Sequence, residues 1–308
     1  MRRKALRFSA LLGLLGLLPN IKNNADRRAT APQPITFAFG AEEPVETTMR
    51  DSWHAGDPYE YYMGRWSKLV AELFIDWLSL PAGLRWLDVG CGSGALSEAV
   101  INKGNPQEVL AIDQSEGFVS SAQQRLGNFA KCKVGNALSL PLEDVSVNVT
   151  VSGLVLNFLS EPETALAEMK RVTKRGGTVA VYVWDYAGRM EFLTYFWDIA
   201  VALNPSASAL HEGRRFPGAN PDALSAAFRR VGFLDVESAP VQVTTHFSDF
   251  DDYWKPFLGG QGPAPTYVLK LEDMERDHLR EALAQRLPIR EDGSIPLTAR
   301  AWAVKGSA

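Results

Sequence analysis

The stretch 85-RWLDVGCGSGALSE-98 decides the fold. Its apolar start ends in Asp88, and Gly90, Gly92 and Gly94 follow on alternate positions before a helical pattern begins. Glycine lets a backbone turn sharply and approach a ligand, and the free N–H groups at the start of a helix attract anionic groups. The stretch therefore predicts a parallel strand that leads into a helix beside a bound nucleotide.

Outward from this stretch, apolar runs alternate with helical patterns. We predict strands at 84–89, 108–112, 131–134, 145–152 and 178–184, and helices at 65–79, 95–103, 116–126 and 164–172. Ser160 and Glu163 have the spacing of a capping box, and Gly176-Gly177 indicates a turn. This alternation predicts a parallel sheet with helices on both faces.

The rhythm changes after Trp184. We predict a helix at 221–231, a strand within 236–247, a charged helix at 266–287 and a last strand at 295–306. The aromatic segment 186–220 and the segment 250–290, which begins with a loop rich in Gly and Pro, are expected to form a substrate cap on a domain that spans 41–308.

Size and composition limit the possible functions. The 308 residues are 46% hydrophobic, which suits one large α/β domain with a cap. The net charge is -4 and no long basic run follows residue 30, so nucleic acid is not an expected partner. Cys91 and Cys132 lack a metal-ligand spacing, so we expect no metal site. The oligomeric state stays open.

Residues 1–40 differ from the rest of the chain. A basic start precedes an apolar stretch at 8–18 that is too short to span a bilayer, so no stable membrane span is expected. We interpret 1–40 as a targeting segment or a disordered extension. The expected location is the cytoplasm, with organelle targeting or export as alternatives.

Carboxylates beside the glycines indicate which nucleotide binds. Asp88 would repel a pyrophosphate, but it suits a ligand with an ammonium group. Asp113 ends the next strand, where a carboxylate accepts ribose hydroxyls. The segment 134-VGNALSLPLED-144 is placed to border an adenine. An amino acid, a ribose and an adenine together describe S-adenosylmethionine.

The chain resembles the Rossmann-like (class I) S-adenosylmethionine-dependent methyltransferases of the small-molecule type, similar to those of ubiquinone and menaquinone biosynthesis. The matching segments are 87-LDVGCGSGALSEAV-100, 109-VLAIDQSEGFVSSAQQRL-126, 134-VGNALSLPLED-144 and 165-ALAEMKRVTKRGGTVAVYVWD-185. The resemblance implies an α/β fold with a seven-stranded, mostly parallel sheet, an antiparallel last strand that contains 299-ARAWAVKG-306, helices on both faces and a cap after the fifth strand.

The resemblance also implies the roles of individual residues. Those expected to bind the cofactor are Asp88, Gly90, Cys91, Gly92 and Gly94 at the methionine part, Asp113 and Gln114 at the ribose and adenine, Asn136 and Ala137 beside the adenine, and Arg65 at the carboxylate. The family usually has Asp where Asn136 stands. Leu156 and Asn157 are expected on the substrate side.

The implied reaction is in-line transfer of a methyl group from S-adenosylmethionine to a small-molecule acceptor. A base is needed only where the acceptor must lose a proton, and His211 and Asp185 are the candidates. Two alternatives stay open: a non-catalytic binding or assembly protein with this fold, and an NAD(P)-dependent oxidoreductase that uses the same glycines.

Overall fold

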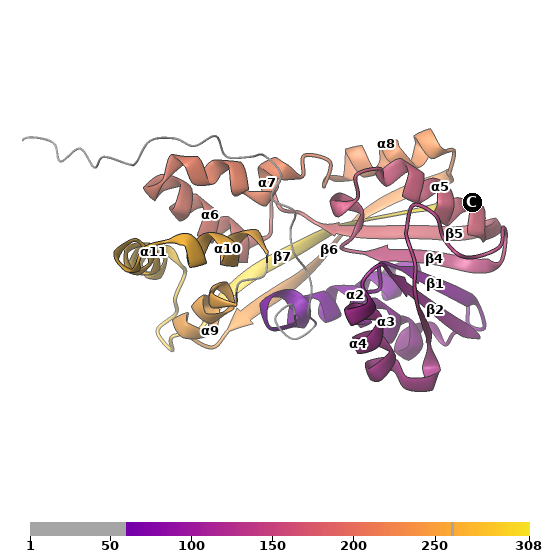
Figure 1. The fold of residues 1–308 in the computed structure, drawn as a ribbon, viewed down its shortest axis with the longest axis horizontal. Helices are drawn as coiled ribbons and strands as arrows, with labels where there is room; N and C mark the ends of the chain where they lie inside the picture. Colours follow the sequence, from indigo (N-terminus) through magenta and orange to yellow (C-terminus); the bar gives the residue numbers. More distant parts are fainter. Residues whose placement is uncertain (1–59, 260–261) are drawn as a thin grey trace, which may run out of the picture. The chain divides into compact units, whose positions relative to one another are not determined.

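The computed structural model describes residues 60–259 and 262–308, so the expected targeting or disordered segment 1–40 lies outside the described residues. A seven-stranded sheet has the order β3-β2-β1-β4-β5-β7-β6. Neighbouring strands from β3 to β5 pair in parallel, whereas β7 lies antiparallel between β5 and β6 (Figure 1). This topology confirms the predicted mostly parallel sheet with an antiparallel last strand.

The strands follow the apolar runs of the sequence. They are β1 (Arg85–Val89), β2 (Glu108–Asp113), β3 (Lys131–Val134), β4 (Val147–Gly153), β5 (Thr173–Trp184), β6 (Leu234–Phe247) and β7 (Ile295–Ser307). The turn predicted at Gly176-Gly177 lies inside β5 instead. There the register with β4 shifts between Val147 and Val149, so the glycines form an irregular stretch of the strand.

Helices cover both faces of the sheet, as the sequence predicts. On one face lie α2 (Arg65–Leu78), α3 (Ala95–Gly104) and α4 (Glu116–Leu126), and on the other lie α5 (Pro162–Val172) and α8 (Pro221–Val231) (Figure 1). The capping box at Ser160 is wrong, because α5 begins at Pro162 after Glu161, without a side-chain cap. Proline has the backbone angle that the first helical position requires, so it sets this start.

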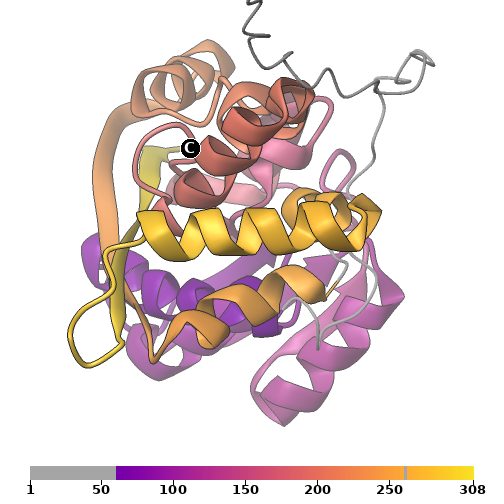
Figure 2. The same ribbon diagram turned by 90° about the vertical axis from the view of Figure 1, so that its left-hand side faces the viewer.

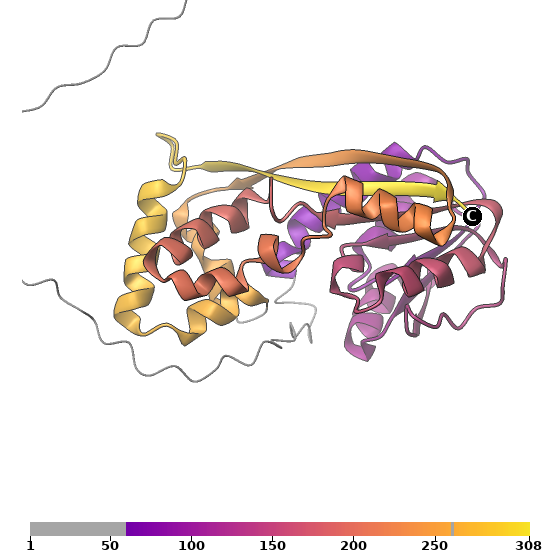
Figure 3. The same ribbon diagram turned by 90° about the horizontal axis from the view of Figure 1, so that it is seen from above.

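Two insertions form a cap beyond the sheet. After β5 come α6 (Glu191–Leu203), η4 (Pro205–Leu210) and α7 (Glu212–Arg215), and between β6 and β7 come α9 (Phe250–Trp254), η5 (Lys255–Leu258), α10 (Pro263–Lys270) and α11 (Asp273–Arg286). Figures 2 and 3 show α11 and α10 beside α6, with β6 and β7 reaching from the sheet to these helices. The short elements η1 (Glu60–Gly64), η2 (Gly127–Phe129) and η3 (Leu156–Phe158) complete the described chain.

The helix predicted at 266–287 is two helices. Leu271 leaves the helical conformation after α10, and Glu272 starts α11 with a capping box that includes Glu275. The backbone N–H of Glu272 donates a hydrogen bond to the Glu275 carboxylate at 3.0 Å, and this cap starts a new helix where the sequence pattern predicts a continuous one.

Aromatic rings join the two insertions. Phe257 stacks on Phe192 and Phe196 with ring centroids 4.6 and 4.5 Å away, and the Tyr253 hydroxyl donates a hydrogen bond to the Phe192 carbonyl at 3.0 Å. These rings are buried, so most of the aromatic material after β5 forms core.

Membrane-spanning helices and metal-binding groups are both absent from the part of the chain that the structure describes. Across 60–259 and 262–308, no helix has both the length and the apolar character needed to cross a membrane. The same residues contain no group of His, Cys, Asp and Glu side chains that could hold a metal ion.

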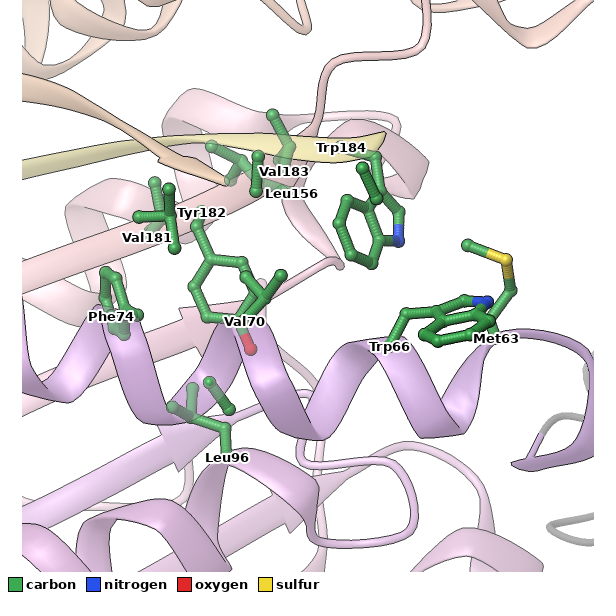
Figure 4. Packing of buried hydrophobic residues seen from close by; sticks show 14 of the residues in the cluster. Met63, Trp66, Val70, Phe74, Leu96, Leu156, Val181, Tyr182, Val183 and Trp184 are labelled. Atoms are coloured by element: carbon green, nitrogen blue, oxygen red, sulfur yellow. The ribbon is translucent and has the colours of Figure 1, made fainter. Parts of the chain in front are cut away.

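Part of the hydrophobic core lies between α2 and β5. Tyr182 extends from β5 toward α2, where its ring lies 4.6 Å from that of Phe74 (Figure 4). Phe74 is fully buried, and the amphipathic pattern of α2 places it on the same face as Val70 and Leu78.

Truncation of this contact should destabilise the protein. Phe74→Ala should lower the free energy of unfolding by about 3–5 kcal/mol, because it removes buried apolar surface and leaves a cavity. Urea denaturation followed by circular dichroism measures this. Leu73→Ala on the exposed face of α2 is the matched control, expected within about 0.5 kcal/mol of wild type. Equal losses in both variants would contradict this account of the core.

Candidate functional site

The loop after β1 is built on glycine conformations. Gly90 and Gly92 have φ angles of +74° and +52°, a backbone conformation that is unfavourable for residues with a Cβ atom. A Cβ atom at Gly90 would lie 2.6 Å from a methyl group of Val155, whereas a Cβ at Gly92 would meet nothing within 4 Å. Gly90 thus permits close packing, and Gly92 presents bare backbone to open space.

Asp113 fixes this loop from the end of β2. One carboxylate oxygen accepts the Gly92 N–H at 2.9 Å, and the other accepts the Ser115 N–H at 2.9 Å. Burial raises the pKa of Asp113, and these backbone bonds oppose that rise. The carboxylate therefore links the two loops at the carboxyl ends of neighbouring strands, and its remaining lone pairs suit ribose hydroxyls.

Asp88 lies on β1 beneath the loop and is 1% exposed. Its Oδ2 accepts a hydrogen bond from the Ser97 hydroxyl at 2.7 Å, and its Oδ1 is buried without a hydrogen-bond partner among the described residues. Burial raises the pKa of Asp88 to about 7, against the lowering effect of the Ser97 bond and with a smaller rise from Asp113. A cationic group at Oδ1 would satisfy this oxygen and favour its ionised form.

A pocket extends from the glycine loop toward the cap. It holds about 1000 Å³ of empty space, part of it open to solvent. Its lining includes the loop residues Gly90, Cys91, Gly92 and Ser93 with Asp113 and Phe118, which we call the inner pocket. The residues that we call the outer pocket are Tyr62, Met63, Phe158, Trp184, Tyr186, Leu193, Glu212 and Pro263. Trp184 points from β5 toward Met63 of η1 and Trp66 at the start of α2 (Figure 4).

The inner part of this pocket fits S-adenosylmethionine. Gly92 leaves a cradle that a side chain would fill. Asp88 is buried behind the loop and is not among the described lining residues, but its unpartnered oxygen suits an ammonium group. Asp113 suits the ribose, and Phe118 in the first turn of α4 offers an apolar wall. Sequence reasoning missed Phe118, although its position just after the acidic strand end was a usable signal.

The expected adenine residues lie next to the pocket in the chain, because Gln114 follows Asp113 and Asn136 follows Gly135, whose N–H donates to the Asp113 carbonyl at 2.9 Å. Gln114 is exposed, and neither it, Asn136 nor Ala137 is among the described residues that line the pocket. The Asn136 side chain accepts the Leu138 N–H at 2.9 Å, which closes a local turn. A short polar side chain bonds to the nearest backbone donor, and this competes with the ligand contact that the motif predicts.

Arg65 ties α2 to the cap. Its guanidinium pairs with Asp252 at 3.0 Å and lies over the rings of Trp66 and Phe247, 4.3 and 4.8 Å from their centroids. Asp252 and the aromatic rings hold this cation, whereas Nε and Nη2 of Arg65 are buried without a hydrogen-bond partner among the described residues. The contact with the cofactor carboxylate therefore stays a prediction.

Leu156 and Asn157 follow β4 but do not line the pocket. Leu156 is buried in the core. The Asn157 amide is buried without a hydrogen-bond partner among the described residues. Their neighbours Val155 and Phe158 line the pocket instead, so the one-turn helix η3 shifts which residues face it.

The two candidate bases also have other partners. Asp185 is buried in an ion pair with Arg300, whose Nε lies 2.8 Å away, and accepts the Arg189 N–H at 3.1 Å. His211 accepts the Gly213 N–H at 3.0 Å through Nδ1, and burial lowers its pKa. Neither residue is among the described residues that line the pocket. Glu212, which follows His211 in the chain, does line it. Glu212 had no sequence signal, because α7 is too short for a helical pattern.

Comparisons with known proteins show methyltransferases as the relatives of this chain. A family model described as a methyltransferase domain matches residues 87–181. A demethylmenaquinone methyltransferase of Geobacillus kaustophilus is 34% identical over 184 residues, which cover 53% of this chain and 76% of the relative. A malonyl-[acyl-carrier protein] O-methyltransferase of Serratia marcescens is 33% identical over 128 residues, 42% of this chain and 49% of the relative.

Solved structures show the same fold. A methyltransferase structure from an antibiotic biosynthesis pathway of Anabaena variabilis superposes with a TM-score of 0.55 at 20% identity, covering 78% of this chain and 96% of the other. One from Bacillus halodurans gives a TM-score of 0.51 at 15% identity, covering 77% and 97%.

The raised pKa of Asp88 predicts pH-dependent cofactor binding. Protonation below about pH 7 removes the negative charge that attracts the ammonium, so affinity for S-adenosylmethionine should fall about tenfold for each further unit of pH. Calorimetric titration across this range measures it. Asp88→Asn should bind weakly and without this dependence, and 5′-methylthioadenosine, which lacks the amino acid part, should show none with wild type. A flat profile for S-adenosylmethionine would refute the contact.

Asp113 should contribute to affinity through the ribose and through the loop. Asp113→Ala should weaken binding of S-adenosylhomocysteine by about 10- to 100-fold, because bonds to an ionised acceptor are lost and the Gly92 N–H loses its partner. Asp113→Asn keeps the shape and should lose less. Calorimetric titration measures these affinities. Unchanged affinity in Asp113→Ala would contradict the assignment of Asp113 to the ribose.

Proposed function

This chain belongs to the class I S-adenosylmethionine-dependent methyltransferases, and we propose that its small-molecule acceptor is a hydroxylated aromatic ring. The family transfers a methyl group from S-adenosylmethionine to a small molecule. The non-catalytic and NAD(P)-dependent alternatives are not favoured, because the relatives are methyltransferases.

The outer pocket supports a ring-shaped acceptor. Tyr62, Phe158, Trp184 and Tyr186 contribute aromatic side chains to its lining. Aromatic faces and edges pack favourably on another ring at centroid distances of about 4.5–7 Å. A pocket with mostly apolar walls and few polar groups binds a ligand of the same character, and the few polar groups orient it.

The name of one relative points in the same direction. The Geobacillus kaustophilus relative is named for demethylmenaquinone, which is a quinone. The reduced form of a quinone carries ring hydroxyls on a flat, apolar body. Such a molecule suits the aromatic walls of this pocket.

The residues would act mainly by orientation and by exclusion of water. S-adenosylmethionine supplies a methyl group that is already activated on a positively charged sulfur. Asp88 and Asp113 would hold its two polar ends, and the aromatic walls would keep the acceptor in line and dry. The chain needs no covalent intermediate for this chemistry.

The test is methyl transfer by the full chain from tritiated S-adenosylmethionine. A reduced naphthoquinone should take up label, and a primary amine and a fatty acid of similar size should not. Trp184→Leu should lower kcat/KM for the ring by about 2- to 13-fold, the value of one aromatic pair, with little change in S-adenosylhomocysteine affinity. Label in the amine alone would overturn the proposal.

A further inference from the structure

We propose that Glu212 is the base that takes the proton from the acceptor hydroxyl during methyl transfer. This inference rests on the proposed function, because only an acceptor that carries a proton on its reacting atom needs a base. It replaces His211 and Asp185, neither of which lines the described pocket.

Glu212 stands in the part of the pocket where the acceptor would bind. It is 3% exposed and lies on the first position of α7. Among the described lining residues the carboxylates are Asp113 and Glu212, and Asp113 holds the glycine loop. Glu212 is therefore the carboxylate of the lining that the loop does not use.

The segment of α7 packs closely against the loop that follows β5 and against η3. A Cβ atom at Gly213 would lie 2.9 Å from the Tyr186 carbonyl, so glycine allows this close approach. Phe216, just after α7, contacts the rings of Tyr186 and Phe158 at 5.4 and 5.1 Å between centroids. Because these two rings line the pocket, the packing sets Glu212 beside the aromatic walls.

Trp197 orients the carboxylate. Its indole Nε1–H donates a hydrogen bond to Oε2 of Glu212, and Trp197 is fully buried on α6. A carboxylate has two oxygens with about four acceptor positions, so this bond is compatible with another to a ligand hydroxyl. A base held in one orientation satisfies the geometric requirement for proton transfer.

The proton step balances. The acceptor O–H bond breaks and its proton forms the O–H of the Glu212 carboxylic acid. The electron pair left on the oxygen forms the new O–CH₃ bond, while the sulfur–methyl bond breaks and its electron pair stays on the now neutral sulfur. The proton leaves Glu212 for water after the products leave.

Two variants separate a base from a structural carboxylate. Glu212→Gln keeps an oxygen that can accept the Trp197 N–H, but it cannot take a proton. Trp197→Phe removes the donor and keeps the carboxylate. Glu163→Gln on the exposed surface of α5, where Glu163 pairs with Arg230, is the matched control.

The first experiment varies the acidity of the acceptor. With a ring hydroxyl that is neutral at the assay pH, Glu212→Gln should lower kcat/KM by about 10²- to 10⁴-fold. With a nitrophenol that is already ionised, the loss of kcat/KM in Glu212→Gln should be far smaller. Trp197→Phe should give an intermediate loss with the neutral hydroxyl, and Glu163→Gln should match wild type. Equal losses with both acceptors would make Glu212 structural and overturn the proposal.

The second experiment needs no turnover. In the presence of S-adenosylhomocysteine, wild type should bind 2-naphthol about tenfold or more tightly than naphthalene, because a charged acceptor strengthens the hydroxyl bond. Glu212→Gln should lose most of this preference. Equal preference in both proteins would overturn the role of Glu212 and leave the ring acceptor standing. If wild type neither binds nor methylates any ring, the ring acceptor and the base are both overturned.

Discussion

The pocket depends on the hydrogen bonds that hold the loop after β1 to the end of β2. The Gly90 and Cys91 N–H groups donate to the Ile112 carbonyl at 2.7 and 2.9 Å, and Gly92 donates to Asp113. These bonds satisfy backbone groups that the tight turn removes from the sheet. They also fix the cradle at Gly92, so cofactor recognition is a property of the backbone as much as of side chains.

The cap supplies what the sheet cannot. A parallel sheet presents only its carboxyl edge to a ligand, and this edge is open to water. The two insertions close it by packing aromatic residues on one another, for example Phe196 on Phe257. The segment of α7 packs on Tyr186, and Glu212 is the glutamate among the described residues that line the apolar chamber beside the cofactor loop.

Buried carboxylates in this protein differ in how their charge is balanced. Asp185, just after β5, forms an ion pair with Arg300 of β7 and so links these two neighbouring strands. Asp88 has a hydroxyl partner and a raised pKa, so its ionised form is stabilised best when a cation binds. A buried charge is costly unless it is paired, which explains why the environment and not the residue type decides its role.

The sequence alone determined the order of the strands, apart from the start of β5, and also the glycine loop and the positions of Asp88 and Asp113, because each depends on residues that are near one another in the chain. Only the tertiary structure decided that Arg65 meets Asp252, 187 residues away, and that Asp185 meets Arg300. It alone brought Glu212 into the pocket. Side chains choose among all the partners that packing brings within reach, and a local pattern contains no information about distant partners.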